Sequence, residues 1–210
     1  MGKIELDFRV LGDVGTNCYL LCNQETKECI LIDAPDLPDR IDEMIAASGC
    51  KLCAVLLTHG HYDHILAAEE VRKRHNVQVY VSEDEKELLH SPQMNLSQDY
   101  GRSTVLDADV YHKDGAHLSL AGLDIEVFHT PGHTAGGSCY YIAEAGILFS
   151  GDTLFAASVG RTDFPTGSMS AIACSIKGKI LVLPDDTKVF PGHGESTSVA
   201  YEKKYNPFLQ

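Results

Sequence analysis

The sequence Thr58-His59-Gly60-His61-Tyr62-Asp63-His64 places three histidines and one aspartate within six positions, directly after the apolar run Ala54-Val55-Leu56-Leu57. A short apolar run with this boundary predicts a buried strand, so His59 begins a loop at the carboxyl end of that strand. Imidazole and carboxylate together suit zinc, iron or manganese, whereas a closed structural zinc site is usually built on thiolates. Four ligand-type residues in six positions are too many for an ordinary polar loop. The stretch therefore predicts an open metal site.

More ligand-type residues follow other predicted strands further along the chain. These residues are His133, Asp152 and His193. Ligands of α/β folds bind outside the carboxyl ends of strands, and strands of one sheet bring such ends to a common edge. The order of strands and helical patterns by itself predicts a mixed α/β layered domain. We therefore expect these side chains to converge on the loop that begins at His59.

The motifs resemble those of the metallo-β-lactamase-fold hydrolases. The stretch His59-Gly60-His61-Tyr62-Asp63-His64 matches their H-x-H-x-D-H signature, and three later motifs follow in the family's order. Those motifs are Thr130-Pro131-Gly132-His133-Thr134, Ser150-Gly151-Asp152-Thr153-Leu154 and Pro191-Gly192-His193-Gly194. Within the family, Gly160-Arg161-Thr162-Asp163-Phe164-Pro165 and Asn206-Pro207-Phe208 look like the glyoxalase II-like branch. The resemblance covers the chain from Gly15-Thr16-Asn17 to Phe208.

This resemblance implies an α/β fold of four layers, an αβ/βα sandwich in which two facing sheets are covered by helices. A length of 210 residues fits one domain of ordinary size, so we expect a single domain over residues 1–210. Apolar runs predict antiparallel strands over residues 4–11, 18–22 and 29–33. A helical pattern covers residues 65–74, and long loops are expected over 90–114 and 155–168.

The resemblance also implies a centre with two divalent metal ions, for which zinc is expected and iron or manganese are the alternatives. The residues that would hold the first ion are His59, His61 and His133. The residues that would hold the second ion are Asp63, His64 and His193. The residue that would bridge the two ions is Asp152.

Two neighbouring cations can share a water molecule, lower its pKa towards neutrality and polarise a substrate carbonyl. The resemblance therefore implies hydrolysis of an activated acyl group, such as the thioester of S-lactoylglutathione, by a hydroxide that bridges the metal ions. Asp63 is the expected catalytic residue, because its charge helps to hold the second ion and its free oxygen can accept the proton lost by water. The nucleophile comes from solvent, so no serine triad is needed.

Two further residues are expected beside the metal ligands. Asp33 ends a predicted strand, and the matching aspartate of the family lies near the metal ions without usually binding them. A role in a turn or a helix cap is the alternative for Asp33. Thr58 is expected to donate a hydrogen bond to a ligand, with ordinary packing at the strand end as its alternative.

The thiol half of the substrate is less well defined by the sequence. Full-length glyoxalase II proteins carry an additional helical segment with basic residues that hold glutathione, whereas this chain ends 17 residues after His193. The stretch Pro191-Gly192-His193-Gly194-Glu195 also lacks the tyrosine of glutathione-binding members. Arg161 is the candidate contact for an acidic substrate, and an ion pair with Asp163 or Asp152 is the alternative. We expect a small acyl-thiol substrate and loose selection of the thiol.

Two other functions compete with thioester hydrolysis. Persulfide dioxygenases also carry a Gly-Arg-Thr-Asp-Phe stretch, and they use a single iron ion held by two histidines and one aspartate. A metal-binding protein without turnover is the other alternative, but the intact ligand set argues against it. An aspartate at position 152 argues against antibiotic-hydrolysing relatives, for which serine or cysteine is expected there. Retention of His61 and His64 argues against the flavin-linked diiron reductases.

The charge of the chain bears on its partners. A formal charge of −13 and a pI near 5.1 repel phosphate backbones and anionic lipids, so we expect no nucleic-acid and no membrane partner. The basic run Arg72-Lys73-Arg74 lies beside Glu69 and Glu70 and is typical of a solvated helix face. The stretch Met1-Gly2-Lys3-Ile4-Glu5-Leu6-Asp7 lacks the apolar core of a signal peptide, so a cytoplasmic protein is expected. The sequence leaves the oligomeric state open.

The seven cysteines are an odd number and lie mostly in apolar segments. This pattern predicts buried free thiols in a reducing compartment. The spacing of Cys50-Lys51-Leu52-Cys53 also permits a redox pair or half of a zinc site. No second pair accompanies it, so buried or edge thiols are the preferred interpretation.

Overall fold

Two six-stranded sheets form the centre of the structure, a computed structural model that describes residues 4–209. The first sheet has the order β1-β2-β3-β4-β5-β6 and the second has the order β14-β13-β10-β9-β8-β7. The expectation about the amino terminus rests partly on Met1, Gly2 and Lys3, which lie outside the described residues. Among residues 4–209, no helix combines the length and the apolar character needed to cross a membrane.

The first sheet starts as an antiparallel meander and continues with parallel strands. The meander confirms the first three predicted strands, and it consists of β1 (Ile4–Leu11), β2 (Thr16–Asn23) and β3 (Glu28–Ile32). The parallel strands are β4 (Lys51–Leu56), β5 (Gln78–Ser82) and β6 (Val110–His112). Parallel neighbours bring the carboxyl ends of β3 and β4 to one edge, so Asp33 lies beside the loop that begins at Leu57.

The second sheet is antiparallel apart from the parallel pair β10 and β13. Its strands are β7 (His117–Leu120), β8 (Leu123–His129), β9 (Ser138–Ile142), β10 (Ile147–Gly151), β13 (Lys188–Pro191) and β14 (Thr197–Ser198). A separate small hairpin joins β11 (Leu154–Phe155) to β12 (Ser158–Val159). This hairpin lies mostly within the stretch predicted as a loop, and its pairing gives a fixed shape to the chain after Asp152.

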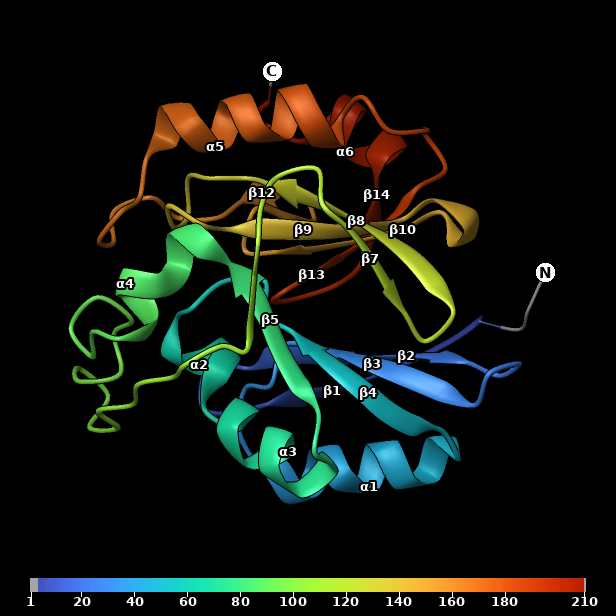
Figure 1. The fold of residues 1–210 in the computed structure, drawn as a ribbon. Coiled ribbons are helices and arrows are strands. Elements are labelled where there is room, and N and C mark those ends of the chain that lie inside the picture. Colours follow the sequence, from blue (N-terminus) through green and yellow to red (C-terminus); the bar gives the residue numbers. More distant parts are fainter. Residues whose placement is uncertain (1–3, 210) are drawn as a thin grey trace.

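Helices cover the outer faces of both sheets (Figure 1). Figure 1 shows α1 (Pro38–Ser48) and α3 (Ala68–His75) against the first sheet, with α5 (Met169–Ser175) and α6 (Val199–Tyr205) against the second. A π-helical turn, Ile176–Ile180, extends α5. Two short helices, α2 (Tyr62–Ile65) and α4 (Lys86–Leu89), lie near the metal-ligand loop. The four layers confirm the predicted αβ/βα sandwich.

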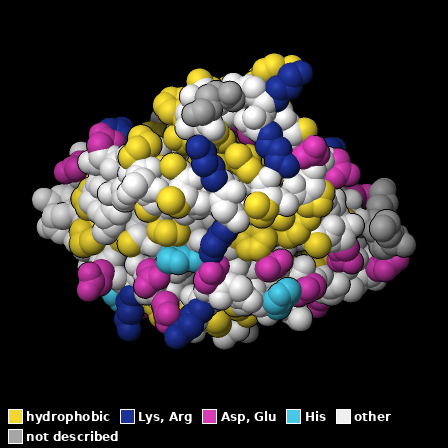
Figure 2. All heavy atoms as spheres, turned by 90° about the horizontal axis from the view of Figure 1, so that it is seen from above, with side chains coloured by type: hydrophobic (Ala, Val, Ile, Leu, Met, Phe, Trp, Pro, Cys, Tyr) yellow, Lys and Arg dark blue, Asp and Glu magenta, His cyan; other side chains and the backbone are white. Residues whose placement is uncertain are grey.

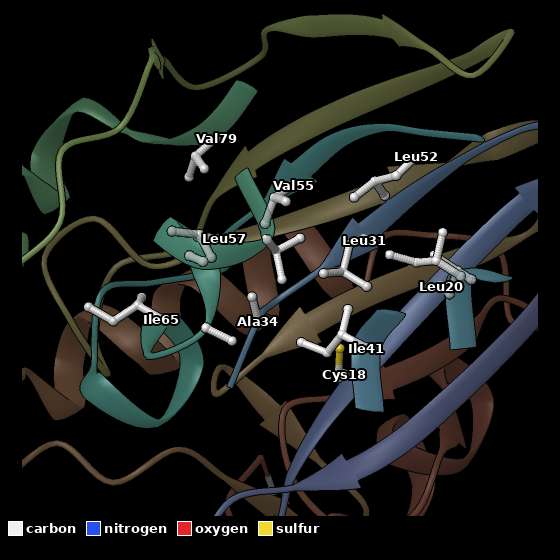
Figure 3. Close-up of a cluster of buried hydrophobic side chains, with 14 of the residues drawn as sticks. Cys18, Leu20, Leu31, Ala34, Ile41, Leu52, Val55, Leu57, Ile65 and Val79 are labelled. Atoms are coloured by element: carbon white, nitrogen blue, oxygen red, sulfur yellow. The ribbon is translucent and has the colours of Figure 1, made fainter. Parts of the chain in front are cut away.

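The inner strands of the first sheet are buried on both faces, which explains their nearly continuous apolar sequences. Leu31 and Val55 point outward to the cluster shown in Figure 3, where Ile41 and Ile65 from the helical side meet them. Their neighbours in the strands point inward and pack against the second sheet. Alternate side chains of a strand face opposite sides, so one run of apolar residues contributes to two cores.

The same alternation separates the thiols of Cys50 and Cys53. Cys50 belongs to the outer cluster, whereas Cys53 packs against the core between the sheets, where its thiol contacts the carbonyl of Cys29 at 3.2 Å. Residues three apart in an extended segment lie on opposite faces, so the two sulfurs do not meet across one ion or one disulfide bond. All seven cysteines are free; six are at least partly buried, but Cys174 is exposed, contrary to the expectation of buried thiols.

The predicted helix over residues 65–74 is interrupted. The amide of Ala67 donates to the carbonyl of Ala34 at 2.9 Å instead of continuing the ladder of α2, and α3 starts only at Ala68. The segment 90–114, predicted as a loop, includes strand β6 at its end. Both differences arise from contacts with distant parts of the chain, which the local pattern does not contain.

Strand β6 carries a buried histidine that links the sheets. His112 Nε2 lies 2.9 Å from the hydroxyl of Tyr140, which donates to the carbonyl of Leu57 at 2.7 Å. The Tyr140 hydrogen is used by that carbonyl, so His112 Nε2 is the donor and its other ring nitrogen carries no proton. Burial, with a smaller effect from His129, lowers the pKa of His112 to about 4.

This lowered pKa predicts a specific loss of stability in acid. An unfolded chain binds a proton at His112 near its usual pKa of about 6.5, whereas the folded chain does so only near 4. Stability therefore falls as the pH decreases between these values, by about 2 kcal/mol from about pH 7 to about pH 5. Urea unfolding of metal-free protein is the measurement. His112→Gln keeps a donor to Tyr140 and should show a shallower decrease, and an identical decrease in both proteins would contradict the assignment.

Candidate metal centre

The predicted ligands come from strand ends of both sheets. His59 and His61 follow β4, and His61 is the residue before α2, whose first turn carries Asp63 and His64. The remaining ligands follow strands β8, β10 and β13 of the second sheet, and they are His133, Asp152 and His193. The site therefore lies where the edges of the two facing sheets meet.

The structure brings all seven predicted ligands together. Their ligand atoms form three groups, within each of which the atoms lie within 4.8 Å of one another. The groups are His59 with His61 and His133, Asp63 with His64 and His193, and His59 with His64 and Asp152. We call the first two groups the first triad and the second triad, and they match the division that the family resemblance implies.

Asp152 lies between the two triads. Its Oδ2 is 3.5 Å from Nε2 of His133 in the first triad and 3.5 Å from Nε2 of His193 in the second. Its Oδ1 is 3.5 Å from Nε2 of His64. One carboxylate thus faces ligand atoms of both groups, as a bridging ligand must.

Several buried ligand atoms have no hydrogen-bond partner among residues 4–209. They are Nε2 of His59, His61 and His64, and Oδ1 of Asp152. Leaving a buried polar atom unpaired costs about 1–3 kcal/mol, so a concentration of such atoms at one point needs a compensating partner. A cation would supply that partner, and a donor set made only of nitrogen and oxygen atoms suits zinc, iron or manganese. The residues present therefore fit a pair of divalent ions.

Neighbouring groups fix the tautomers of the histidines. Nδ1 of His64 donates to Asp33 at 2.8 Å, and Nδ1 of His133 donates to the carbonyl of Arg161 at 2.8 Å. Nδ1 of His193 lies 3.3 Å from the carbonyl of Gly15. With the hydrogen held at Nδ1, each ring presents the lone pair of Nε2 to the centre.

Asp33 and Thr58 form one network behind the ligands. Asp33 accepts hydrogen bonds from the amide and the hydroxyl of Thr58, each at 2.8 Å, in addition to the bond from His64. The hydroxyl hydrogen of Thr58 is bound by Asp33, so the oxygen of Thr58 accepts from Nδ1 of His59 at 3.2 Å. Thr58 thus contacts a ligand as an acceptor, whereas a donor was expected. A single buried carboxylate therefore orients one histidine of each triad.

The electrostatics of the two triads differ. Burial and the neighbouring histidines lower the pKa of His59 and His61 well below the usual value, which keeps both rings neutral. Burial also acts to lower the pKa of His64, but the charges of Asp63, Asp33 and Asp152 outweigh it and raise this pKa to about 10. The negative potential that causes this increase also favours a divalent cation beside Nε2 of His64.

Asp63 receives a contact that the sequence pattern does not reveal. Its Oδ2 accepts a hydrogen bond from the hydroxyl of Thr16 at 2.8 Å and lies 3.3 Å from Nε2 of His193. Thr16 also pairs with His193 through an isolated β-bridge. Thr16 stands in the Gly15-Thr16-Asn17 stretch where the family resemblance begins, which is the only signal for it in the sequence.

A cleft of about 390 Å³ opens above the ligands. Tyr62 and Tyr100 stack on one wall with ring centroids 4.4 Å apart, and Phe155 and Phe164 line the cleft as well. Arg161 is the single lysine or arginine among the described residues that line it. Its guanidinium makes two 2.7 Å hydrogen bonds with Asp163 and lies over the ring of Phe164. The ion pair expected as the alternative role for Arg161 is therefore present, although the side chain still borders the cleft.

Comparison with known proteins gives the family of this arrangement. The family model described as "Metallo-beta-lactamase superfamily" matches residues 11–193, a range that contains every predicted ligand. The chain belongs to this superfamily. Membership and the His/Asp cluster support a metal-dependent hydrolase with a two-metal site.

Similar proteins of the superfamily carry several names. A probable metallo-hydrolase, YqgX of Bacillus subtilis, is 35% identical over 95% of this chain and 94% of its own length. Hydroxyacylglutathione hydrolase GloC of Haemophilus influenzae is 34% identical, with 92% of each chain covered. Both relatives match this chain along nearly their whole length.

Solved structures of the superfamily show the same fold. BLEG-1 B3 metallo-beta-lactamase has a TM-score of 0.93 and 36% identity, covering 98% of this chain and 99% of its own. TTHA1623 in a di-iron-bound form has a TM-score of 0.86 and 32% identity, covering 97% of this chain and 100% of its own. ETHE1 from Myxococcus xanthus has a TM-score of 0.79 and 33% identity, covering 96% of this chain and 83% of its own. These neighbours leave the metal and the substrate of this superfamily member open.

Proposed function

We propose that the chain is a thioester hydrolase that acts on small acyl thiols such as S-lactoylglutathione. The observation that carries the proposal is the complete second triad, since a single-iron site would need only three of the seven ligands that converge here. Similarity to GloC supports the same reaction class. We propose zinc for both ions, with iron or manganese as alternatives that the same ligands accommodate.

Two bound divalent ions would supply an activated water and would polarise the carbonyl of the substrate. The first triad and the second triad would hold them, with Asp152 between. The chain itself contributes the orientation of these ligands, because Asp33, Gly15 and the Arg161 carbonyl hold the histidine rings. Preorganised ligands avoid reorganisation during the reaction, which is a main source of catalytic power.

Asp63 is proposed to accept a proton during catalysis. Its Oδ2 is engaged by Thr16, and its Oδ1 makes no hydrogen bond to the rest of the described chain. Burial works to raise the pKa of Asp63, but His64, His193 and Thr16 outweigh it and lower this pKa far below its ordinary value. Asp63 is therefore ionised in the resting protein, and its Oδ1 is the oxygen that we propose as the proton acceptor.

The residues that line the cleft favour a small acyl group over a long anionic thiol. Its walls are mostly aromatic and aliphatic, and its one guanidinium is already paired with Asp163. A glutathione moiety carries two carboxylates, which would find few cationic partners among the lining residues. We propose that the acyl end supplies most of the recognition and that the thiol is selected loosely.

The remaining properties follow from charge and surface. We propose that the protein has no nucleic-acid or membrane partner, because its formal charge is −13. The face over α5 and α6 fits this proposal, since its lysine and arginine side chains are scattered among hydrophobic and acidic ones (Figure 2). We also propose that it works in the cytoplasm.

Metal analysis and activity assays together test the proposal. Protein purified without added metal should contain close to two equivalents of divalent metal and should hydrolyse a series of acyl thioesters with similar catalytic efficiency. One iron per chain with oxygen uptake on a persulfide would instead show a dioxygenase. Metal without either activity would show a non-catalytic metal-binding protein.

Two further sets of substrates should be tested beside the acyl thioesters. A chromogenic β-lactam belongs in it because of the similarity to BLEG-1 B3 metallo-beta-lactamase, and its preferential hydrolysis would overturn the thioester assignment. A matched series on one acyl group with different thiols tests selection of the thiol. A preference for glutathione of about a thousandfold, or some 4 kcal/mol, would show a dedicated thiol site and contradict the loose selection proposed.

A further inference from the structure

Glu85 is a fully buried carboxylate outside the metal-ligand set. It ends the 3-10 turn Glu83–Glu85 after β5 and has 0% exposure. Its Oε2 accepts a hydrogen bond from the amide of Gly60 at 2.7 Å. Its Oε1 accepts two more, from the hydroxyl of Thr134 at 2.6 Å and from the amide of Gly136 at 2.8 Å. The two oxygens thus join two separate segments of the chain.

Both segments carry ligands of the first triad. Gly60 stands between His59 and His61, whereas Thr134 and Gly136 follow His133. The first segment extends from β4 of one sheet and the second connects β8 to β9 of the other sheet. Glu85 therefore fixes the distance between two loops that no continuous strand connects, at the place where the first ion would bind.

The two glycines allow the loops to approach the turn of Glu85 closely. A Cβ atom on Gly60 would lie 3.0 Å from Oε2 of Glu85 and 2.8 Å from a methyl of Leu88. A Cβ atom on Gly136 would lie 2.6 Å from the backbone nitrogen of Glu85. A side chain at Gly60 or Gly136 would push its loop away from the turn that ends at Glu85. The close packing and the hydrogen bonds therefore favour the same position of both loops against that turn.

Burying a carboxylate among neutral donors has an energetic cost, so the hydrogen bonds of Glu85 must be complete. Desolvation raises the pKa of Glu85, and the three donors only partly offset this effect. A buried charge is tolerated when its hydrogen bonds are complete, and removal of one donor or acceptor leaves an unpaired buried group. The carboxylate differs from a glutamine here because both of its oxygens accept.

We propose that Glu85 is a positioning residue that sets the spacing of the first triad and thereby the affinity of that triad for its metal ion. It touches no ligand atom and acts through the backbone of Gly60 and through the segment after His133. The inference rests on the two-metal centre and is independent of which substrate the enzyme hydrolyses. Groups that hold metal ligands in place typically change metal affinity by about 10–100-fold when they are replaced.

Glu85→Gln tests the proposal with little change of shape. The glutamine side chain has one oxygen and one NH2 group in place of the two oxygens. In one orientation the NH2 group faces the backbone N–H of Gly60, and in the other it faces the two donors of Thr134 and Gly136. At least one hydrogen bond is therefore lost. Titration with zinc against a chromogenic chelator should show that one of the two ions binds about 10–100-fold more weakly. The other ion should keep its affinity within about threefold, and the visible spectrum of the cobalt-substituted protein should change for one site.

Glu202→Gln is the matched control. Glu202 is also buried, and its carboxylate accepts from the amide of Ala157, the hydroxyl of Thr197 and the side chain of Asn206, none of which adjoins a metal ligand. Both variants should lose stability to urea, but only Glu85→Gln should lose affinity for one ion. Equal weakening of both ions, or weakening in the Glu202 variant as well, would show general loosening and overturn the proposal.

A second variant covers the case in which Glu85→Gln does not fold. Thr134→Val removes one donor to Glu85 and keeps the size of the side chain. It should weaken the same single ion by a smaller factor, about threefold to tenfold. Unchanged affinity for both ions in this folded variant would overturn the proposal. None of these measurements uses a substrate, so an error in the assigned reaction would appear only in the activity assays.

Discussion

Replacing Asp63 by asparagine is expected to abolish most turnover while leaving the fold intact. The change removes one negative charge from the second triad and also removes the proposed proton acceptor. Loss of positioned acid-base function alone typically costs about 10²–10⁴-fold, and weaker binding of the second ion adds to that loss. The amide still accepts the hydrogen bond from Thr16, so the loop that carries position 63 should keep its place.

The measurement is kcat at saturating metal, with metal content determined on the same sample. Asp185→Asn is a suitable control, because Asp185 is an exposed aspartate that pairs with Lys203 on the surface. That variant should retain its activity and both ions. An Asp63→Asn enzyme with a near-normal rate at full metal loading would remove Asp63 from catalysis.

Replacing Gly192 by alanine is expected to have a comparably large effect through steric conflict. A Cβ atom at this position would lie 2.2 Å from Oδ1 of Asp152 and 2.8 Å from Cε1 of His64. Both contacts are far shorter than van der Waals distance, and neither partner can move without leaving the metal centre. A displacement of about 1 Å in a catalytic group can cost about 10²-fold in rate, and we expect at least that loss.

Metal content and kcat after refolding with excess metal are the measurements for this variant. Gly178→Ala is the matched control, because among residues 4–209 no heavy atom outside its own helical turn lies within 4 Å of the place that its methyl group would take. It should leave both quantities unchanged. Full activity with two bound ions in Gly192→Ala would mean that the space beside Asp152 and His64 is not part of the working centre.

The sequence predicts the centre better than it predicts the intervening segments. The family resemblance names the ligands, and most of them follow strands whose ends meet at one edge of the facing sheets; Asp63 and His64 instead lie in the short helix α2. The interruption after Ile65 escapes prediction because it depends on the carbonyl of Ala34, which lies more than thirty positions away in the chain. The short strand β6 and the hairpin of β11 and β12 escape it for the same reason, since pairs of two or three residues carry no clear local pattern.

Other features could not be predicted because they depend on which atom of a side chain or backbone is used. The sequence draws attention to the guanidinium of Arg161, yet the group that touches a metal ligand is its backbone carbonyl, which holds His133. Glu85 belongs to no sequence motif, because acidic residues are common in turns after strands and nothing in the sequence sets this one apart. The opposite faces of Cys50 and Cys53 are also not evident from the sequence, because the strand predicted there covers only residues 54–57 and the pairing of β3 with β4 shifts register beside Cys29.

The origin of the ligands in both sheets has a consequence for the stability of the whole fold. An ion held by His59 and His133 would join the two halves of the sandwich in the way that a cross-link does, because each half supplies part of each triad. Ions that bind only the folded state add RT ln(1 + [L]/Kd) to the free energy of unfolding. With such ions bound, we expect the resistance of this protein to heat and to proteolysis to rise with the free metal concentration around it, so that metal supply would govern how long the molecule survives as well as how fast it works.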